Sequence, residues 1–82
     1  MHFVYLLQSQ IDNGFYIGQS EDVFLRFKNH TNGLVESTKN RRPLNLIYFE
    51  AYLTKETALE REKKLKCFGS AYTGLLKRLG LK

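Results

Sequence analysis

The hydrophobic residues of this chain fall into three short apolar runs and three segments with helical spacing. The apolar runs cover residues 2–8, 15–18 and 44–52, and their length and aromatic or β-branched content are typical of strands. Between the first two runs lies Asp12-Asn13-Gly14, which favours a tight turn because asparagine and glycine adopt positive φ at little cost. The first two strands should therefore form an antiparallel hairpin.

A helix is predicted directly after this hairpin. Ser20 offers an N-cap, and Glu21 and Asp22 should place negative charge in the first turn, where the helix dipole favours it. The helix should run to about Asn32 and stop at Gly33. Its apolar stripe is predicted to consist of Val23, Phe24 and Phe27.

Two further helices are predicted after the third strand. Thr54 should cap a helix that continues to about Phe68 and is broken by Gly69, and Ser70 should begin the last helix. The resulting order is β-β-α-β-α-α. We therefore expect one α/β (α+β) domain over residues 1–82, with a small three-stranded antiparallel or mixed sheet flanked by helices.

The charge of the chain favours a polyanionic partner. Thirteen lysines and arginines stand against eight acidic residues, for a net charge of +5. The basic residues cluster in residues 61–66, in residues 75–82 and at Lys39, Arg41 and Arg42, whereas the acidic residues are spread along the chain. Nucleic acid is the expected partner, and Lys39, Arg41 and Arg42 are predicted to contact its phosphates.

Several classes of protein do not fit the sequence. No apolar run approaches the roughly 20 residues of a membrane span, and residues 1–10 lack the pattern of a signal peptide. The single cysteine, Cys67, cannot form an internal disulfide, so we expect a cytoplasmic protein with no membrane partner. His2, His30 and Cys67 lack the spacing of zinc ligands, and Cys67 has no histidine beside it for a cysteine hydrolase.

Glu62 occupies an unusual position on the second predicted helix. On a helical wheel it lies within the apolar stripe, between Leu59 and Leu65. A carboxylate on a buried face is costly unless it is paired or binds a cation. It can therefore be part of a core ion pair with an arginine or lysine, or the ligand of a hard divalent ion such as Mg²⁺.

Arg26, His30 and Gly18 also have two interpretations each. Arg26 and His30 lie four residues apart and border the apolar stripe of the first helix, so they can point toward a cleft or be ordinary surface residues. Gly18 can mark a bulge or the end of a strand, or it can let a phosphate approach the backbone.

The spacing of the two strand tyrosines connects these residues. Ten residues separate Tyr5, in Phe3-Val4-Tyr5, from Tyr16, in Tyr16-Ile17-Gly18, and Arg26 follows ten residues after Tyr16. In this pattern, with His30 and Glu62, the chain resembles the GIY-YIG nuclease superfamily over nearly its whole length. It looks most like the small single-domain bacterial members of the UPF0213 (YhbQ-like) group.

The resemblance implies an endonuclease that hydrolyses phosphodiester bonds, most readily in DNA, with Mg²⁺ or Mn²⁺. Glu62 would hold the metal and Arg26 a phosphate oxygen. Tyr5 or Tyr16 would take a proton from water with the help of His30, and which tyrosine does so stays open. DNA repair is among the roles that the resemblance implies.

The resemblance also limits what to expect. Gly74 stands where many larger members have an asparagine, so one polar contact should be missing. No zinc finger, helix-turn-helix or other module that reads a sequence is found, so we expect a nuclease with a weak or structural preference, or one that a protein partner directs. Two alternatives remain, namely a non-catalytic nucleic-acid-binding module and a protein-interaction domain that uses Phe68, Tyr72 and the last helix.

Overall fold

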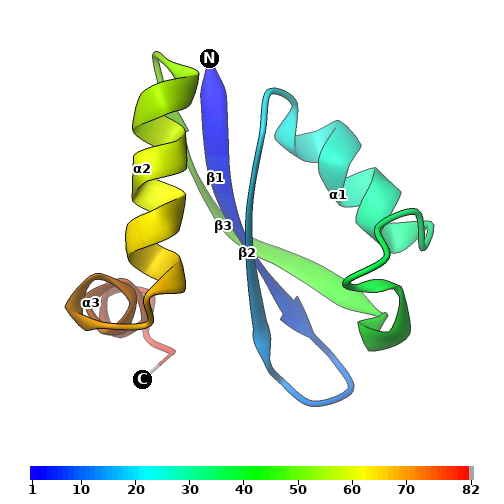
Figure 1. The fold of residues 1–82 in the computed structure, drawn as a ribbon. Helices are drawn as coiled ribbons and strands as arrows, with labels where there is room; N and C mark the ends of the chain where they lie inside the picture. Colours follow the sequence, from blue (N-terminus) through cyan, green and yellow to red (C-terminus); the bar gives the residue numbers. More distant parts are fainter. Residues whose placement is uncertain (82) are drawn as a thin grey trace.

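Three strands and three helices follow one another in the order that the apolar runs predict (Figure 1). The computed structural model describes residues 1–81. The elements are β1 (His2–Ser9), β2 (Phe15–Ser20), α1 (Val23–Thr31), the 3-10 turn η1 (Lys39–Arg41), β3 (Leu44–Tyr52), α2 (Lys55–Lys66) and α3 (Ser70–Arg78). In residues 1–81 no helix combines the length and the apolar character that crossing a bilayer requires.

β1 is the central strand of an antiparallel sheet with the order β2-β1-β3. Tyr5 pairs with Gly18 of β2 and with Phe49 of β3, and Leu7 pairs with Tyr16. Because successive strand residues point to opposite faces, Tyr5, Tyr16 and Gly18 all belong to the same face. The sheet is therefore antiparallel rather than mixed, and its register brings the two tyrosines together.

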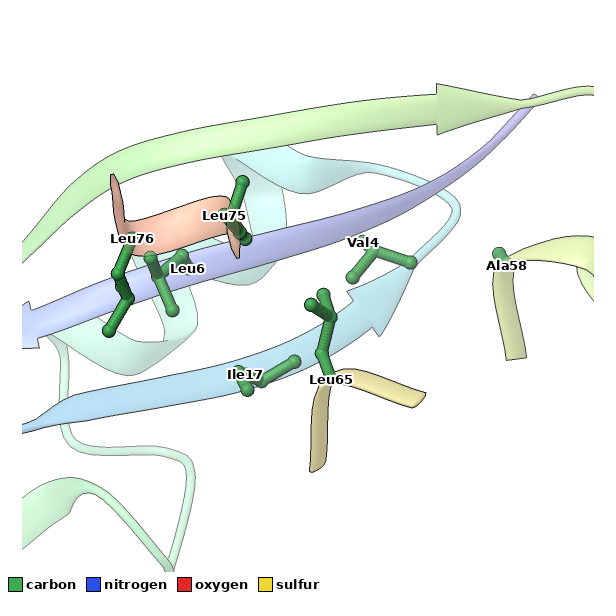
Figure 2. Close-up of a cluster of buried hydrophobic side chains, with 7 residues drawn as sticks. All are labelled: Val4, Leu6, Ile17, Ala58, Leu65, Leu75 and Leu76. Atoms are coloured by element: carbon green, nitrogen blue, oxygen red, sulfur yellow. The ribbon is translucent and has the colours of Figure 1, made fainter. Parts of the chain in front are cut away.

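Each face of the sheet has its own hydrophobic cluster. In Figure 1, α1 lies on one side of the strands and α2 with α3 on the other. Figure 2 shows the cluster under α2 and α3, formed by Val4, Leu6, Ile17, Ala58, Leu65, Leu75 and Leu76. The cluster under α1 consists of Tyr5, Leu7, Val23 and Leu44. The central strand therefore contributes alternate side chains to both cores.

The helix boundaries correct part of the prediction for α1. Its cap is Asp22, whose carboxylate accepts a hydrogen bond from the Leu25 amide at 3.0 Å, so the prediction of Ser20 as the cap is wrong. β2 continues through Ser20, and its hydroxyl bonds the backbone of Asp22 instead. The first turn of α1 therefore holds no acidic residue. Phe24, predicted in the apolar stripe, is exposed.

The remaining helix ends agree with the prediction more closely. The helix α1 ends at Thr31, and Gly33, with a φ of +75°, follows its C-cap Asn32. Thr54 caps α2 by accepting from the Thr57 amide at 3.2 Å. At the end of α2, however, the left-handed residue is Phe68 (φ +56°) rather than Gly69. Gly69 instead precedes α3, whose first residue is Ser70.

Glu50 joins β3 to α2 and thereby fixes the position of that helix. Its carboxylate accepts hydrogen bonds from Tyr48, at 3.0 Å, and from Tyr52, and it pairs with the Arg61 guanidinium at 3.1 Å. Burial and the bond to Glu50 raise the pKa of Tyr52 to about 12, so its hydroxyl stays a donor. Arg78 donates to the Tyr48 hydroxyl at 2.8 Å, which ties α3 to the same strand.

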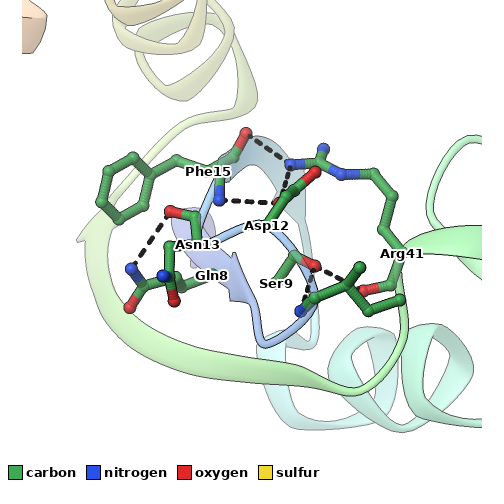
Figure 3. A network of polar contacts seen from close by, with 8 residues as sticks. Gln8, Ser9, Asp12, Asn13, Phe15 and Arg41 are labelled. Atoms are coloured by element: carbon green, nitrogen blue, oxygen red, sulfur yellow. Dashed lines mark hydrogen bonds and ion pairs between the residues drawn. The ribbon is translucent and has the colours of Figure 1, made fainter.

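The loop between α1 and β3 is attached to the tip of the β1–β2 hairpin (Figure 3). Asn13 has a φ of +60°, and the Asp12 carboxylate accepts from the Gly14 amide at 2.8 Å. The Arg41 guanidinium lies 3.9 Å from the Asp12 carboxylate, and the Ser9 hydroxyl donates to the Arg41 carbonyl at 2.7 Å. The segment that the sequence presents as a polar loop is therefore anchored at its far end.

Candidate active site

Three aromatic rings meet on the face of the sheet that α1 covers. Tyr5 comes from the middle of β1, Tyr16 from β2 and His30 from the last turn of α1. The ring centroids are 6.5 Å apart for Tyr5 and Tyr16, 5.7 Å for Tyr5 and His30, and 5.2 Å for Tyr16 and His30. Residues that are distant in the sequence thus form one cluster, which is why we take it as the candidate active site.

Gly18 makes room for the Tyr5 ring. A Cβ at this position would lie 2.3 Å from the Tyr5 hydroxyl oxygen and 2.4 Å from its Cζ. Since β2 continues through Ser20, Gly18 does not mark the end of a strand. The close approach of a phosphate is not needed to explain the glycine, because the tyrosine opposite it in the register already requires one.

His30 is fully buried rather than an ordinary surface histidine. Its Nε2 lies 2.8 Å from the Tyr5 hydroxyl oxygen and its Nδ1 lies 2.7 Å from Oγ1 of Thr38. Burial, together with the positive charge of Arg26, lowers the pKa of His30 from 6.5 to about 4. The imidazole is therefore neutral at pH 7 and can accept a proton on one nitrogen.

Tyr5 is buried as well, and burial raises the pKa of its phenol. The Arg26 guanidinium acts in the opposite direction, while the nearby Tyr16 and Glu62 raise the pKa further. These effects place Arg26 and Glu62 within electrostatic reach of the hydroxyl. Tyr16 is only half-buried, so its side chain is more open to solvent than that of Tyr5.

Arg26 is the cation of this cluster. It lies on α1 one turn before His30 and is half-buried. Within residues 1–81 its guanidinium makes no ion pair with a carboxylate. A partly buried guanidinium with no acidic partner is suited to bind a phosphate oxygen, because its donors form a fixed fork.

Glu62 comes from α2, on the other side of the sheet from α1 (Figure 1). Its side chain is 16% exposed and pairs with Lys66, one turn further along the same helix, at 3.1 Å. The carboxylate is thus half-buried and paired with a neighbouring lysine rather than with a partner in the core. Because β2 is an edge strand, groups from the two faces can approach each other around it.

A metal at Glu62 would have few protein ligands. Within residues 1–81, no group of three or more histidine, cysteine, aspartate or glutamate side chains is gathered closely enough to hold an ion. A single carboxylate fits Mg²⁺ or Mn²⁺, since Mg²⁺ commonly keeps several waters and binds one or two carboxylates together with a substrate phosphate. It does not fit a structural zinc site.

The three basic residues predicted to contact phosphates lie outside the cluster and have partners of their own. Lys39 pairs with Glu36 at 3.2 Å, and Arg41 holds the hairpin turn. Arg42 donates to the Lys39 carbonyl at 2.8 Å. Each can still attract a polyanion, but none is brought to the two tyrosines.

Thr38 is a site residue that the sequence reasoning missed. It lies in the loop between α1 and β3 and is fully buried, and its hydroxyl forms a hydrogen bond with Nδ1 of His30. A threonine in a segment without periodicity gives no signal of burial. Gly74 is exposed on α3, and an added Cβ there would meet nothing within 4 Å.

The comparison with protein families decides the affiliation. Residues 1–73 match the family model of the GIY-YIG catalytic domain. The chain belongs to the GIY-YIG family, a family of nucleases.

Two relatives and one solved structure place the chain near the UPF0213 proteins. The chain is 43% identical over 68 residues to a UPF0213 protein of Staphylococcus epidermidis and 41% identical over 68 residues to one of Staphylococcus aureus, in each case covering 82% of both chains. The solution NMR structure of a UPF0213 protein from Bacillus halodurans has a TM-score of 0.58 and 32% identity, and it covers 95% of this chain and 83% of that one. The predicted GIY-YIG fold and the UPF0213 resemblance are thus confirmed.

Replacing Gly18 by alanine tests the contact that shapes the cluster. The added methyl group has no space beside the Tyr5 ring, so we expect Gly18→Ala to lower the free energy of unfolding by about 1–3 kcal/mol. Gly74→Ala is the matched control, because its Cβ meets open space within a helix and should stabilise the protein by about 0.5–1 kcal/mol. Urea unfolding of both variants measures the difference. Equal effects would contradict the conclusion that the Tyr5 ring requires a glycine at position 18.

The buried histidine predicts how stability depends on pH. The folded state holds His30 neutral down to about pH 4, whereas the unfolded chain binds a proton below pH 6.5. Stability from this group is therefore complete above pH 6.5 and is lost as the pH falls toward 4, by about 3 kcal/mol. Urea unfolding at several pH values should give a shallower dependence in His30→Gln. Parallel curves for the two proteins would refute the buried neutral state.

Proposed function

We propose that this domain is a divalent-metal-dependent endonuclease that hydrolyses phosphodiester bonds in DNA. The observation that carries the proposal is the meeting of Tyr5, Tyr16, Arg26 and His30 in one cluster, with Glu62 within electrostatic reach of Tyr5. A cation for phosphate, a carboxylate for a metal and a hydroxyl with a proton acceptor are the groups that this hydrolysis needs. Membership of a nuclease family supports the same reaction class.

Arg26 binds the scissile phosphate in this proposal. In the free protein the charge of its guanidinium acts to lower the pKa of both the Tyr5 phenol and the His30 imidazole. A phosphate would occupy the guanidinium donors, while the oxygen of Tyr5 would accept from water. The negative phosphate also offsets the charge that disfavours protonation of His30. Substrate binding would thus prepare both groups for proton transfer.

Glu62 would hold the metal in this proposal, with its carboxylate released from the ion pair with Lys66. A bound Mg²⁺ or Mn²⁺ supplies stabilisation of the negative charge that develops on the phosphate and on the leaving oxygen. Glu62 itself has to be ionised and oriented, and the ion pair between Arg61 and Glu50 fixes the rotation of α2 that orients it.

Tyr5 is assigned as the group that takes the proton of the attacking water. An isolated phenol has a pKa near 10, so ionising it beforehand at pH 7 would cost about 4 kcal/mol. Tyr5 avoids this cost if it passes its own proton to Nε2 of His30, at 2.8 Å, as it receives one. Tyr16, which is more exposed, then orients the water. The close bond to a proton acceptor is what favours Tyr5 over Tyr16.

The substrate class follows from charge, while the choice among DNA structures does not. A net charge of +5 on 82 residues favours a nucleic acid. Contacts to phosphates position a nucleic acid without reading its sequence, so a protein partner would supply specificity and thereby decide any role in DNA repair. The competing function is a non-catalytic nucleic-acid-binding module, which the exposed Gly74 favours because no side chain is present there.

Cleavage of supercoiled plasmid and branched DNA with Mg²⁺ or Mn²⁺ tests the proposal. We expect Glu62→Gln and Tyr5→Phe to lose at least about 100-fold in rate, and EDTA to abolish cleavage. Glu60→Gln, an exposed glutamate two residues from Glu62 on the same helix, is the matched control and should change the rate less than about twofold.

The same assay separates the competing functions. Cleavage that persists in Glu62→Gln or in EDTA would contradict the metal site. A wild-type protein that cleaves neither DNA but binds both, with an affinity that falls as salt rises, would support the binding module instead.

A further inference from the structure

Both ring nitrogens of His30 face a hydroxyl group. The Tyr5 oxygen lies 2.8 Å from Nε2, and the Thr38 oxygen lies 2.7 Å from Nδ1. His30 and Thr38 are both fully buried, and Tyr5 is 2% exposed. The three side chains therefore form a linear chain of hydrogen bonds inside the protein, from the central strand through α1 to the loop before β3.

This chain of hydrogen bonds can run in only two directions. A neutral imidazole has one N–H donor and one bare nitrogen that accepts. In the first direction Tyr5 donates to Nε2, and the Nδ1–H group donates to Thr38. In the second direction Thr38 donates to Nδ1, and the Nε2–H group donates to Tyr5. The two directions correspond to the two tautomers of His30.

Counting donors and acceptors favours the first direction. There, the Thr38 proton can point to the Val35 carbonyl, 3.5 Å away, and the Tyr5 proton is donated to Nε2. In the second direction the proton of the Tyr5 hydroxyl has no acceptor among the hydrogen bonds of residues 1–81, because His30 is the one partner of that hydroxyl among them. A buried donor left without a partner costs about 1–3 kcal/mol.

We infer that Thr38 is a positioning residue that holds His30 as the Nδ1–H tautomer, with the bare Nε2 facing Tyr5. The tautomer follows from the hydrogen bonds alone, while its catalytic consequence rests on the proposed nuclease function. In that reaction only a bare Nε2 can receive the proton of Tyr5 while Tyr5 takes one from water. Thr38 acts through His30 and touches neither substrate nor metal.

The backbone around Thr38 keeps its hydroxyl in place. The Thr38 and Lys39 amides both donate to the Val35 carbonyl, at 3.1 Å and 3.0 Å, which forms a turn just before η1. At its other end the loop is held to the hairpin through Ser9 and Arg41. The orientation of the catalytic imidazole is thus linked to the conformation of the whole 34–43 loop.

The tautomer can be measured directly by NMR on the ¹⁵N-labelled wild-type protein. Protonated and bare imidazole nitrogens have widely separated ¹⁵N shifts, and the protein has only two histidines, so His2→Gln assigns the signals of His30. At pH 7 we expect a protonated Nδ1 and a bare Nε2. A protonated Nε2 in the wild-type protein would overturn the inference.

Two variants of Thr38 test the positioning role. Thr38→Ser keeps the hydroxyl and should keep both the Nδ1–H tautomer and, within about threefold, the cleavage rate. Thr38→Val has a similar shape but no acceptor, so His30 should switch to the Nε2–H tautomer. We expect kcat to fall about 100-fold with little change in KM. In a Tyr5→Phe background the same change should have almost no further effect.

The outcomes separate this inference from the nuclease proposal. If wild-type protein shows the Nδ1–H tautomer and Thr38→Val switches it while no DNA is cleaved, the positioning role stands and the nuclease function fails. If DNA is cleaved but Thr38→Val keeps the tautomer, the positioning role fails and the nuclease function stands. Should Thr38→Val not fold, as its amide spectrum would show, the wild-type tautomer together with Thr38→Ser decides.

Discussion

The hydrogen bond between Tyr5 and His30 joins the central strand to α1, and the other groups of the site are arranged around it. Gly18 has no side chain because the Tyr5 ring occupies that space. Thr38 holds the opposite nitrogen of the imidazole. Arg26 acts on both partners of the bond, since it lowers the pKa of the phenol and of the imidazole alike. A change at any of these residues should therefore alter the position or the pKa of the Tyr5 hydroxyl.

Burial and the charge of Arg26 have opposite effects on the pKa of Tyr5, and both lower the pKa of His30. Burial keeps both Tyr5 and His30 neutral, so the free protein holds no charged base. Negative charge near Arg26 would favour protonation of His30, because it would offset the positive charge that lowers the pKa of the imidazole. In the proposed function a bound phosphate provides that charge, and the metal at Glu62 balances it on the other side.

The sequence predicts much of this fold and site, and its failures have physical causes. Three apolar runs predict the strands, and the family resemblance points to Tyr5, Tyr16, Arg26 and His30, which the structure brings together. The register of the hairpin does not follow from its turn residues, so the sequence could not predict that the Tyr5 ring packs over Gly18. Ser20 and Asp22 are equally good capping residues, and only the length of β2 decides between them. A buried loop threonine leaves no periodic signal at all.

The central claim is that one carboxylate, that of Glu62, brings a metal to groups presented by the opposite face of the sheet. Paramagnetic broadening of the ¹H–¹⁵N spectrum by Mn²⁺, recorded with a short DNA oligonucleotide, tests it most directly. The account predicts broadening centred on Glu62 that extends to Tyr5 and Tyr16 and disappears in Glu62→Gln. Broadening that stays unchanged in Glu62→Gln, or that centres on exposed carboxylates such as Glu56 and Glu36, would contradict it.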